Sequence, residues 1–259
     1  MLTAITASHI SKMSIQLASE SVSDVRRKAS RFMFHLTSRS SRAMLTPRDL
    51  MKTECDTKQK LLDTAMQLIW EQSYGAVSVD HICERAGAKK GSFYHFFPSK
   101  SDLAVAAIDD HWQQLRPDLD RIFSPQTPPL DRLAGYCDLV YERQKLKLQE
   151  FGVVCGCVFT SLGSELSTQD EKIRKKSLQI MEWRCKYLAA AIRDAVREGL
   201  IPDQDCDAKA RDLYGCVMGV LLQAKIENNL GIIRHLKPTI FRLIGVPEKE
   251  NAGTHSLHP

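Results

Sequence analysis

The chain has 259 residues, of which 43% are hydrophobic and 26% charged. These values are close to those of ordinary soluble proteins and exclude a collagen-like, wholly disordered or small disulfide-stapled chain. Only 13 glycines and 10 prolines are present, which favours helices over a turn-rich β fold. The net charge of +5 lies entirely in residues 1–50, and residues 51–259 hold 28 basic and 28 acidic side chains. The overall charge therefore does not support nucleic-acid binding, and only a local basic patch would support it.

Residues 1–50 are rich in serine and arginine, poor in acids and weakly periodic. Three interpretations are possible: a disordered arm that contacts DNA phosphates, an organelle transit peptide, or a segment that is not part of the functional protein. We favour the last interpretation, in which Met51 is a natural translation start just before the first helix, with Met44 and Met1 as the alternatives. The polar residues 247–259 are predicted to be a disordered tail.

Helical periodicity begins near residue 57, where apolar residues from Leu61 to Trp70 recur at three- and four-residue steps. This pattern predicts a helix over 57–73. Ser78 is a suitable N-cap for a short second helix, which Gly87 ends. A third short helix is predicted near 90–96. Ser99, with Asp102 three residues later, predicts the start of a fourth helix over about 100–122.

A break at residues 124–129 (Ser-Pro-Gln-Thr-Pro-Pro) separates these elements from longer patterns. Helices are predicted over about 130–148, 170–199, 207–230 and 236–244, and a glycine-containing apolar stretch covers 151–166. No strand pattern is visible, so the fold class is predicted to be all-α. The longest uncharged stretches, 151–164 and 213–224, are too short to cross a bilayer, and no secretory signal is visible. Eight irregularly spaced cysteines indicate reduced thiols, so a cytoplasmic location with no membrane partner is expected.

Two short helices joined by Ala86-Gly87 and preceded by a longer helix describe a helix-turn-helix unit. The second helix of such a unit enters the major groove of DNA. From Arg85 to Ser101 the chain holds four cations and no acid, which supports a contact with phosphates. Lys90 and His95 are positioned to reach base edges. The alternative is that these cations form a solvated surface.

The residues of this unit also resemble a known family. The order of Asp63-Thr64-Ala65, Val77-Ser78-Val79-Asp80-His81-Ile82, Ala86-Gly87 and then Gly91-Ser92-Phe93-Tyr94 through Lys100 to Leu103 is similar to the DNA-binding domain of TetR/AcrR-type bacterial repressors. The resemblance covers about residues 56–105. It implies an all-helical homodimer that binds a pseudo-palindromic double-stranded DNA operator and releases it when a small molecule enters the C-terminal domain. The implied domains are residues 51–103 for DNA binding and 104–246 for ligand binding and dimerisation.

The resemblance assigns roles position by position. Ser92, Tyr94 and Lys100 match residues that contact phosphates, and Lys89, Lys90 and His95 occupy positions that read bases. For Tyr94 the alternative is a core aromatic residue. Two positions depart from the family pattern: Lys89 replaces a capping serine, and Ser73 replaces a glycine that closes the first helix.

The C-terminal half carries fewer signals. The helices near 170–199 and 207–230 are candidates for the dimer interface, because Gly215 and Gly219 share one face and allow close helix approach; the alternative is an intrachain contact. Candidate walls of a ligand pocket are aromatic, and each of them has core packing as its alternative. They are Trp112, Tyr136, Tyr141, Phe159 and Trp183.

Cys155 and Cys157 flank a glycine in an uncharged segment and are candidate redox-sensing thiols, with inert packing as the alternative. No nearby histidine completes a zinc site. No nucleophile motif or phosphate-binding glycine loop is visible, so an enzyme is not expected, and neither is a cofactor or metal. The sequence thus predicts a dimeric, ligand-responsive repressor, with thiol modification as the alternative signal.

Overall fold

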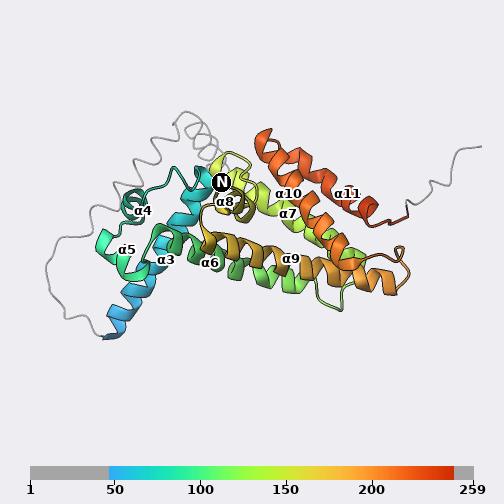
Figure 1. Ribbon diagram of the computed structural model, residues 1–259, viewed down its shortest axis with the longest axis horizontal. Coiled ribbons are helices and arrows are strands. Elements are labelled where there is room, and N and C mark those ends of the chain that lie inside the picture. Colours follow the sequence, from blue (N-terminus) through green and yellow to red (C-terminus); the bar gives the residue numbers. More distant parts are fainter. Residues whose placement is uncertain (1–46, 248–259) are drawn as a thin grey trace, which may run out of the picture. The chain divides into compact units, whose positions relative to one another are not determined.

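The computed structural model describes residues 47–247, with side chains from residue 56 onwards (Figure 1). The predictions for residues 1–46 and 248–259 lie outside the described residues. The chain divides into two compact units, residues 1–50 and 51–259, and the description below concerns the second. Every regular element within residues 47–247 is helical: α3 (Pro47–Glu71), α4 (Val79–Ala86), α5 (Lys90–Phe96), α6 (Lys100–Ile122), α7 (Pro129–Phe151), α8 (Val158–Leu166), α9 (Glu171–Arg197), α10 (Cys206–Ile226), the 3-10 helix η2 (Leu230–His235) and α11 (Leu236–Leu243).

The predicted all-α fold with an N-terminal helix-turn-helix and a C-terminal helical domain is confirmed. None of the helices within residues 47–247 has both the length and the apolar character that a bilayer crossing requires. The boundary predicted between 51–103 and 104–246 stays a prediction.

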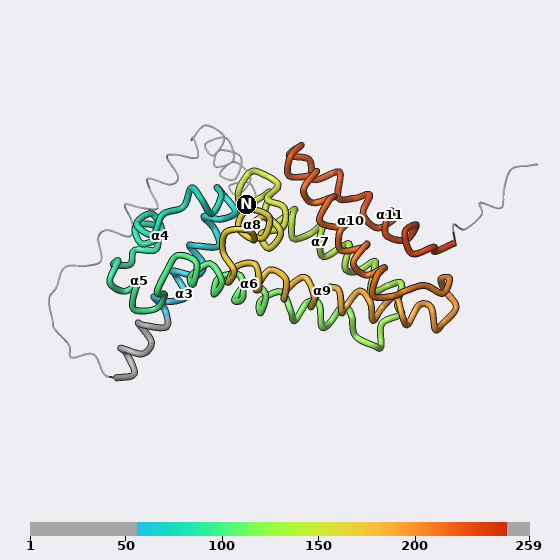
Figure 2. Tube along the Cα trace, in the orientation of Figure 1, coloured from blue at the N-terminus to red at the C-terminus, as the bar shows by residue number. Residues whose placement is uncertain are grey.

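Local capping chemistry sets both ends of α4 and the start of α6, whose path is followed in Figure 2. The Ser78 hydroxyl accepts a hydrogen bond from His81 N, and the Ser99 hydroxyl accepts one from Asp102 N. Gly87 adopts a left-handed conformation, with φ of 65°, and ends α4. A side chain at this φ is strained, which explains why a glycine stands at the turn.

One hydrophobic core runs through the second unit, and α9 lies at its centre. This helix contacts α6, α7, α8 and α10. Figure 1 shows α9 running beside α6. Small residues at Ala191 and Ala195 of α9 are completely buried, and they let neighbouring helices approach closely. The position of α9 means that a change on any neighbouring helix is felt by the others.

The segment 151–166 differs from its predicted single stretch. Helix α7 extends to Phe151, and α8 begins only at Val158. Gly152 and Gly156 between them have φ of 74° and 72°, which breaks the helical path. The buried Gln144 side chain donates to Gly156 O (2.9 Å) and accepts from Gly156 N (3.0 Å), so it fixes this connection onto α7.

Boundaries of two other predicted helices also shift. The first helix ends at Glu71 rather than residue 73, and it begins at Pro47 rather than 57. The helix predicted over 207–230 ends at Ile226, because Asn228 has a positive φ of 46° and the chain turns into η2. The predicted last helix, 236–244, matches α11 closely.

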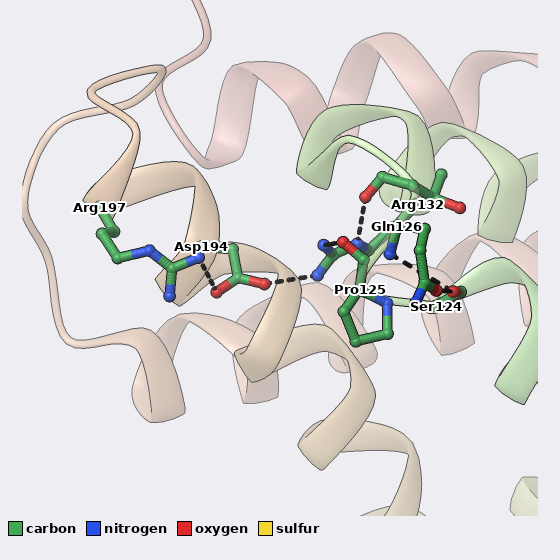
Figure 3. Close-up of polar contacts among 7 residues, drawn as sticks. Ser124, Pro125, Gln126, Arg132, Asp194 and Arg197 are labelled. Carbon is green, nitrogen blue, oxygen red and sulfur yellow. Dashed lines mark hydrogen bonds and ion pairs between the residues drawn. The ribbon is translucent and has the colours of Figure 1, made fainter.

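A buried arginine joins the start of α7 to α9 (Figure 3). Arg132 is 4% exposed. Its guanidinium donates to Thr127 O (2.6 Å), Pro125 O (3.0 Å) and the Asp194 carboxylate (2.5 Å). Asp194 also pairs with Arg197 at 2.7 Å. The proline-containing turn before α7 is therefore held by side-chain chemistry rather than by regular structure.

Candidate functional site

Helix α5 has one buried side and one exposed side. Phe93 and Phe97 are buried, at 0% and 3% exposed, and attach the helix to α6 and the core. Lys89, Lys90, Tyr94 and His95 are exposed, and Ser92 is half-buried. The 51% exposure of Tyr94 rules out the core-aromatic alternative. Four of the five candidate DNA-contacting side chains in and before α5 are therefore exposed, and we call the five together the α5 face (Lys89, Lys90, Ser92, Tyr94 and His95).

The predicted capping defect at Lys89 is present. Lys89 occupies the N-cap position of α5, and its side chain makes no capping hydrogen bond. By contrast, the Ser78 hydroxyl caps α4. The first backbone N–H groups of α5 are therefore left without the side-chain acceptor that a serine would supply.

Two of the four cations counted in the sequence are paired with acids from neighbouring segments. Arg85 forms a double hydrogen bond with Glu71 at 2.5 and 2.8 Å. Lys90 pairs with Asp80 at 2.8 Å, and this pair is largely exposed to solvent. The net positive charge of the patch is therefore smaller than the sequence count indicates. An exposed pair of this kind is weak and exchanges easily for a phosphate.

Lys100 has an intramolecular role that the sequence did not indicate. Its ammonium group donates to Tyr74 O (2.9 Å) and Val77 O (2.8 Å) and lies 3.8 Å from the centre of the Tyr74 ring. Burial lowers the pKa of Lys100. The side chain therefore ties α6 to the turn that follows α3. A phosphate contact by Lys100 stays a prediction.

The same turn is held from the other side by Glu165 of α8. The Glu165 carboxylate accepts from Gly75 N at 2.8 Å and from Tyr74 N at 3.3 Å. Burial, together with Asp170, Glu165 and Asp102, raises the pKa of Tyr74 to about 12. We call this arrangement of Lys100, Glu165 and residues 74–77 the turn clamp. It connects the helix-turn-helix with α8, and no local pattern in the sequence marks Glu165 for this role.

Polar contacts also join the first half of α6 to α9. Ser101 donates to Asp170, Lys172 pairs with Asp102 at 2.7 Å, and Lys176 pairs with Asp109 at 2.8 Å. Helix α6 thus begins beside α5 and stays attached to α9 for several turns. These contacts link the N-terminal part of α9 to the start of α6.

The five aromatic residues predicted for a ligand pocket do not come together. Trp112 and Trp183 stack at 5.2 Å with an interplanar angle of 27°, beside a surface cleft of about 420 Å³. Phe159 lines a separate cavity. Tyr136 is 3% exposed, and its buried hydroxyl has no hydrogen-bond partner among residues 56–247. The Tyr141 hydroxyl accepts from Arg234 at the surface. The ligand assignments of these residues stay predictions.

Phe159 belongs to a cavity of about 70 Å³ between α6, α7, α8 and α9, which we call the inner cavity. Arg143 and Arg184 also line it, and sequence reasoning missed both because they are ordinary helical arginines in the sequence. A larger outer cleft of about 430 Å³ borders α3, α6 and α7. The two share Trp70, His111, Arg143 and Lys147, so the inner cavity and the outer cleft are neighbours.

The two candidate redox cysteines differ in environment. Cys155 is 1% exposed, and burial raises its pKa, which disfavours the reactive thiolate. Cys157 is half-buried at the wall of the inner cavity, and its sulfur lies 3.8 Å from the Arg184 guanidinium. Only Cys157 of the pair therefore has both access and a neighbouring cation.

Helix α10 exposes an apolar stripe. Gly215, Gly219, Leu222 and Ile226 recur at four- and three-residue steps and are exposed, Leu222 at 57% and Ile226 at 74%. A Cβ atom placed on either glycine would meet no atom within 4 Å. Within the described residues, close intrachain packing therefore does not explain these glycines.

Comparison with known proteins agrees with this geometry. The profile for "Bacterial regulatory proteins, tetR family" matches residues 61–107, and the profile "Tetracyclin repressor-like, C-terminal domain" matches residues 129–239. An uncharacterized HTH-type transcriptional regulator in the lacX 3' region of Lactococcus lactis is 30% identical over 196 residues, 73% of this chain and 95% of the relative. The HTH-type transcriptional repressor NemR of Escherichia coli is 25% identical over 203 residues, 75% of this chain and 97% of the relative.

Solved structures lead to the same assignment. The crystal structure of regulatory protein TetR from Rhodobacter sphaeroides superposes with a TM-score of 0.64 at 28% identity and covers 72% of this chain and 98% of that one. The matches span the helix-turn-helix and the C-terminal helices alike. The α5 face, the helical order and the relatives agree, and the chain belongs to the TetR family of bacterial transcriptional regulators.

Proposed function

We propose that this protein is a dimeric repressor that binds a pseudo-palindromic operator through the α5 face of each subunit and leaves it when a small molecule enters the C-terminal domain. The observation that carries the proposal is the division of α5 into a buried aromatic side and an exposed polar side. Such a helix can enter the major groove while its apolar side stays in the core. A relative named as a repressor, NemR, supports the sign of regulation.

The dimer has a role in this proposal because it sets the distance between the two copies of α5. Two half-sites of an operator lie about one helical turn of DNA apart, roughly 34–36 Å. The apolar stripe of α10 (Gly215, Gly219, Leu222 and Ile226) supports a contact with a second copy, because its glycines permit close helix approach. A two-fold axis through this contact matches the two-fold symmetry of an operator.

Release follows from coupling between ligand and DNA. A ligand shifts the protein away from DNA only if it binds the DNA-incompetent arrangement more tightly. Helix α6 is the lever, because it carries Lys100 at the turn clamp and borders the C-terminal cavities through His111 and Trp112. The ion pairs of α6 with α9 transmit movement between these two ends.

The test is binding of the purified protein to DNA upstream of its own and neighbouring genes, across a series of salt concentrations. We expect selective binding that weakens steeply with salt. Tyr94→Ala should weaken binding to all sequences and leave the salt slope unchanged, because a hydroxyl that contacts a phosphate carries no charge and releases no counterion. Lys89→Ala, at a position assigned to base reading, should change the preferred sequence. His95→Ala should change the preferred sequence.

Lys175→Ala is the matched control, because Lys175 is an exposed lysine on α9, and it should bind DNA as the parent does. A second preparation that starts at Met51 tests whether residues 1–50 contribute. Unchanged operator affinity in the α5-face variants would overturn the proposal.

A second candidate signal is modification of Cys157. The half-buried position of Cys157 at the cavity wall, with its sulfur beside the Arg184 guanidinium, supports this candidate. Iodoacetamide is a suitable probe: it forms a carbon–sulfur bond, and iodide and the thiol proton leave to solvent. Alkylation should release the operator from the parent protein and from Cys155→Ser, but not from Cys157→Ser. Release that persists in the double Cys155→Ser/Cys157→Ser variant eliminates this candidate.

A further inference from the structure

The inner cavity is positively charged. Arg143, Lys147 and Arg184 line it, and no carboxylate does. Two of these cations have acidic partners outside the cavity: Arg143 pairs with Asp118 at 2.9 Å, and Lys147 pairs with Glu150 at 2.9 Å. Arg184 forms no ion pair with any acid in the described part of the chain. The uncompensated charge of the cavity is therefore that of Arg184.

Two guanidinium nitrogens at the cavity wall lack acceptors. Within residues 56–247, the Nε atoms of Arg143 and Arg184 are shielded from solvent and have no hydrogen-bond partner. Burying a charged donor without an acceptor is costly, so native proteins rarely leave such groups unmatched. A ligand that brings a negative charge and two acceptor atoms would satisfy them. A carboxylate matches a guanidinium in both charge and shape.

The position of Arg184 is fixed by its surroundings. Its guanidinium lies 5.0 Å from the centre of the Phe159 ring, and one nitrogen lies 3.8 Å from the Cys157 sulfur. Neither neighbour neutralises the charge. The arginine is therefore held ready on an apolar wall, as in sites that bind an anion without first rearranging.

The apolar walls and the volume limit the ligand. A volume of about 70 Å³ corresponds to roughly two water molecules, at about 30 Å³ each, so the inner cavity takes a head group and little more. The His111 ring lies 5.5 Å from Phe159 and 5.0 Å from Trp70, and these three rings lead to the outer cleft. The body of a ligand can therefore extend along aromatic surfaces toward the 430 Å³ cleft.

We propose that the inner cavity binds the carboxylate of a small organic acid, with Arg184 as its counter-charge and with the apolar body of the acid lying along Phe159 and His111. The inference deepens the proposed function and rests on it, because the cavity is an inducer site only if the protein is a ligand-responsive repressor. It names the inducer class as organic monocarboxylates. Trp70 belongs to α3, so an acid that extends past His111 also contacts the helix-turn-helix unit.

The experiment measures binding by calorimetry and by the shift of Tm in the full-length protein. The probes are benzoate and butyrate, their neutral amides benzamide and butyramide, and inorganic phosphate. We expect saturable binding of at least one carboxylate, with its amide weaker by at least about tenfold. Phosphate should not bind at the same site. Equal binding of acid and amide, equal binding of phosphate, or no binding of either acid would overturn the inference.

Variants of Arg184 separate binding from folding. Arg184→Met keeps the apolar volume and removes the charge, so it should lose carboxylate binding by at least about tenfold while the ligand-free Tm rises, because an unmatched buried charge is gone. Arg184→Lys should fold and bind more weakly than the parent. The control Arg193→Met, at an exposed arginine of the same helix, should bind as the parent does. Full carboxylate binding by Arg184→Met overturns the inference.

Operator release distinguishes this inference from the function on which it rests. Carboxylate binding that depends on Arg184 but leaves operator affinity unchanged supports the site and contradicts its role in induction. Selective operator binding by a protein that binds no carboxylate supports the repressor and contradicts the site.

Discussion

Some side chains of α5 anchor the helix to the core, and others are exposed and available to contact DNA. The spacing of these residues in the sequence predicts most of this division. Phe93 and Phe97 are four residues apart and both are buried, whereas Tyr94 and His95 point outward. The charge state of the surface could not be predicted in the same way. Lys90 meets Asp80 and Arg85 meets Glu71 across helices, and such pairs depend on the three-dimensional arrangement.

Replacing Asp80 by asparagine should strengthen operator binding. The change frees Lys90 from its ion pair and removes a negative charge near the α5 face. If Lys90 then reaches a phosphate, the slope of log affinity against log salt should become steeper by about one. Fluorescence anisotropy across a salt series measures both effects. Asp131→Asn, in the first turn of α7, is the matched control, and identical slopes for the two variants would contradict the prediction.

His111 should make folding stability depend on pH. Burial, with further contributions from Arg143, Arg184 and Lys147, lowers the pKa of His111 to about 4. The unfolded chain therefore binds a proton at this residue near pH 6.5, and the folded protein does not until about pH 4. Stability is lost as pH falls between these values, by up to about 3 kcal/mol from this residue alone.

The measurement is the free energy of unfolding of the parent and of His111→Gln between pH 7 and pH 4. Comparing the two isolates His111, because the acidic side chains that also titrate in this range are common to both. The advantage of the parent over the variant should shrink as pH falls. A difference that is constant with pH would show that His111 titrates normally.

At the scale of elements, helix boundaries that carry a local capping residue are the most predictable features. Ser78 and Ser99 cap the helices that follow them, Gly87 ends the helix that precedes it, and all three do what their local chemistry predicts. The segment 151–166 was less predictable. Its apolar residues fit a helix, but Gly152 and Gly156 adopt positive φ and Gln144 fixes the connection from another element. Distant packing decides between two conformations that the local sequence allows.

The start of α7 should depend on the Arg132–Asp194 pair. Arg132→Met leaves the Asp194 carboxylate with Arg197 alone and frees the carbonyls of Pro125 and Thr127. Breaking a buried pair from one side is expected to lower the free energy of unfolding by about 3 kcal/mol. Chemical denaturation of Arg132→Met, Asp194→Leu and the double variant measures the coupling. Additive losses would show that the two side chains act independently.

At the scale of the whole molecule, the fold class and the position of the helix-turn-helix could be predicted from sequence, and the ligand cavity could not. Aromatic residues were reasonable wall candidates, yet Trp112 and Trp183 stack beside one cleft while Phe159 lines another cavity. Arg184 and Glu165 acquire their roles only through contacts with residues far along the chain. Sequence periodicity records which side of a helix is buried but not which partner covers it.

The dimer should depend on the exposed stripe of α10. Leu222→Glu combined with Ile226→Glu places two charges on the surface that the proposal assigns to a second copy. We expect a folded monomer by analytical ultracentrifugation and a large loss of operator affinity, because each half-site is then bound alone. Leu146→Glu, at a leucine of α7 that is 60% exposed, should stay dimeric. A dimer that survives the α10 changes would place the interface elsewhere.

The turn clamp limits how this protein can exchange parts with its relatives. Glu165 is encoded in the C-terminal half of the chain, and the two amide groups that it accepts from belong to the N-terminal half. A chimaera that joins the operator specificity of one regulator to the effector response of another takes the turn from one parent and its acceptor from the other. Successful grafts should therefore be those in which the effector-binding parent supplies an acidic side chain at the position of Glu165. In engineered sensors built on this scaffold, the residue at this position, rather than overall sequence similarity, would decide which DNA-binding and effector-binding halves can be combined.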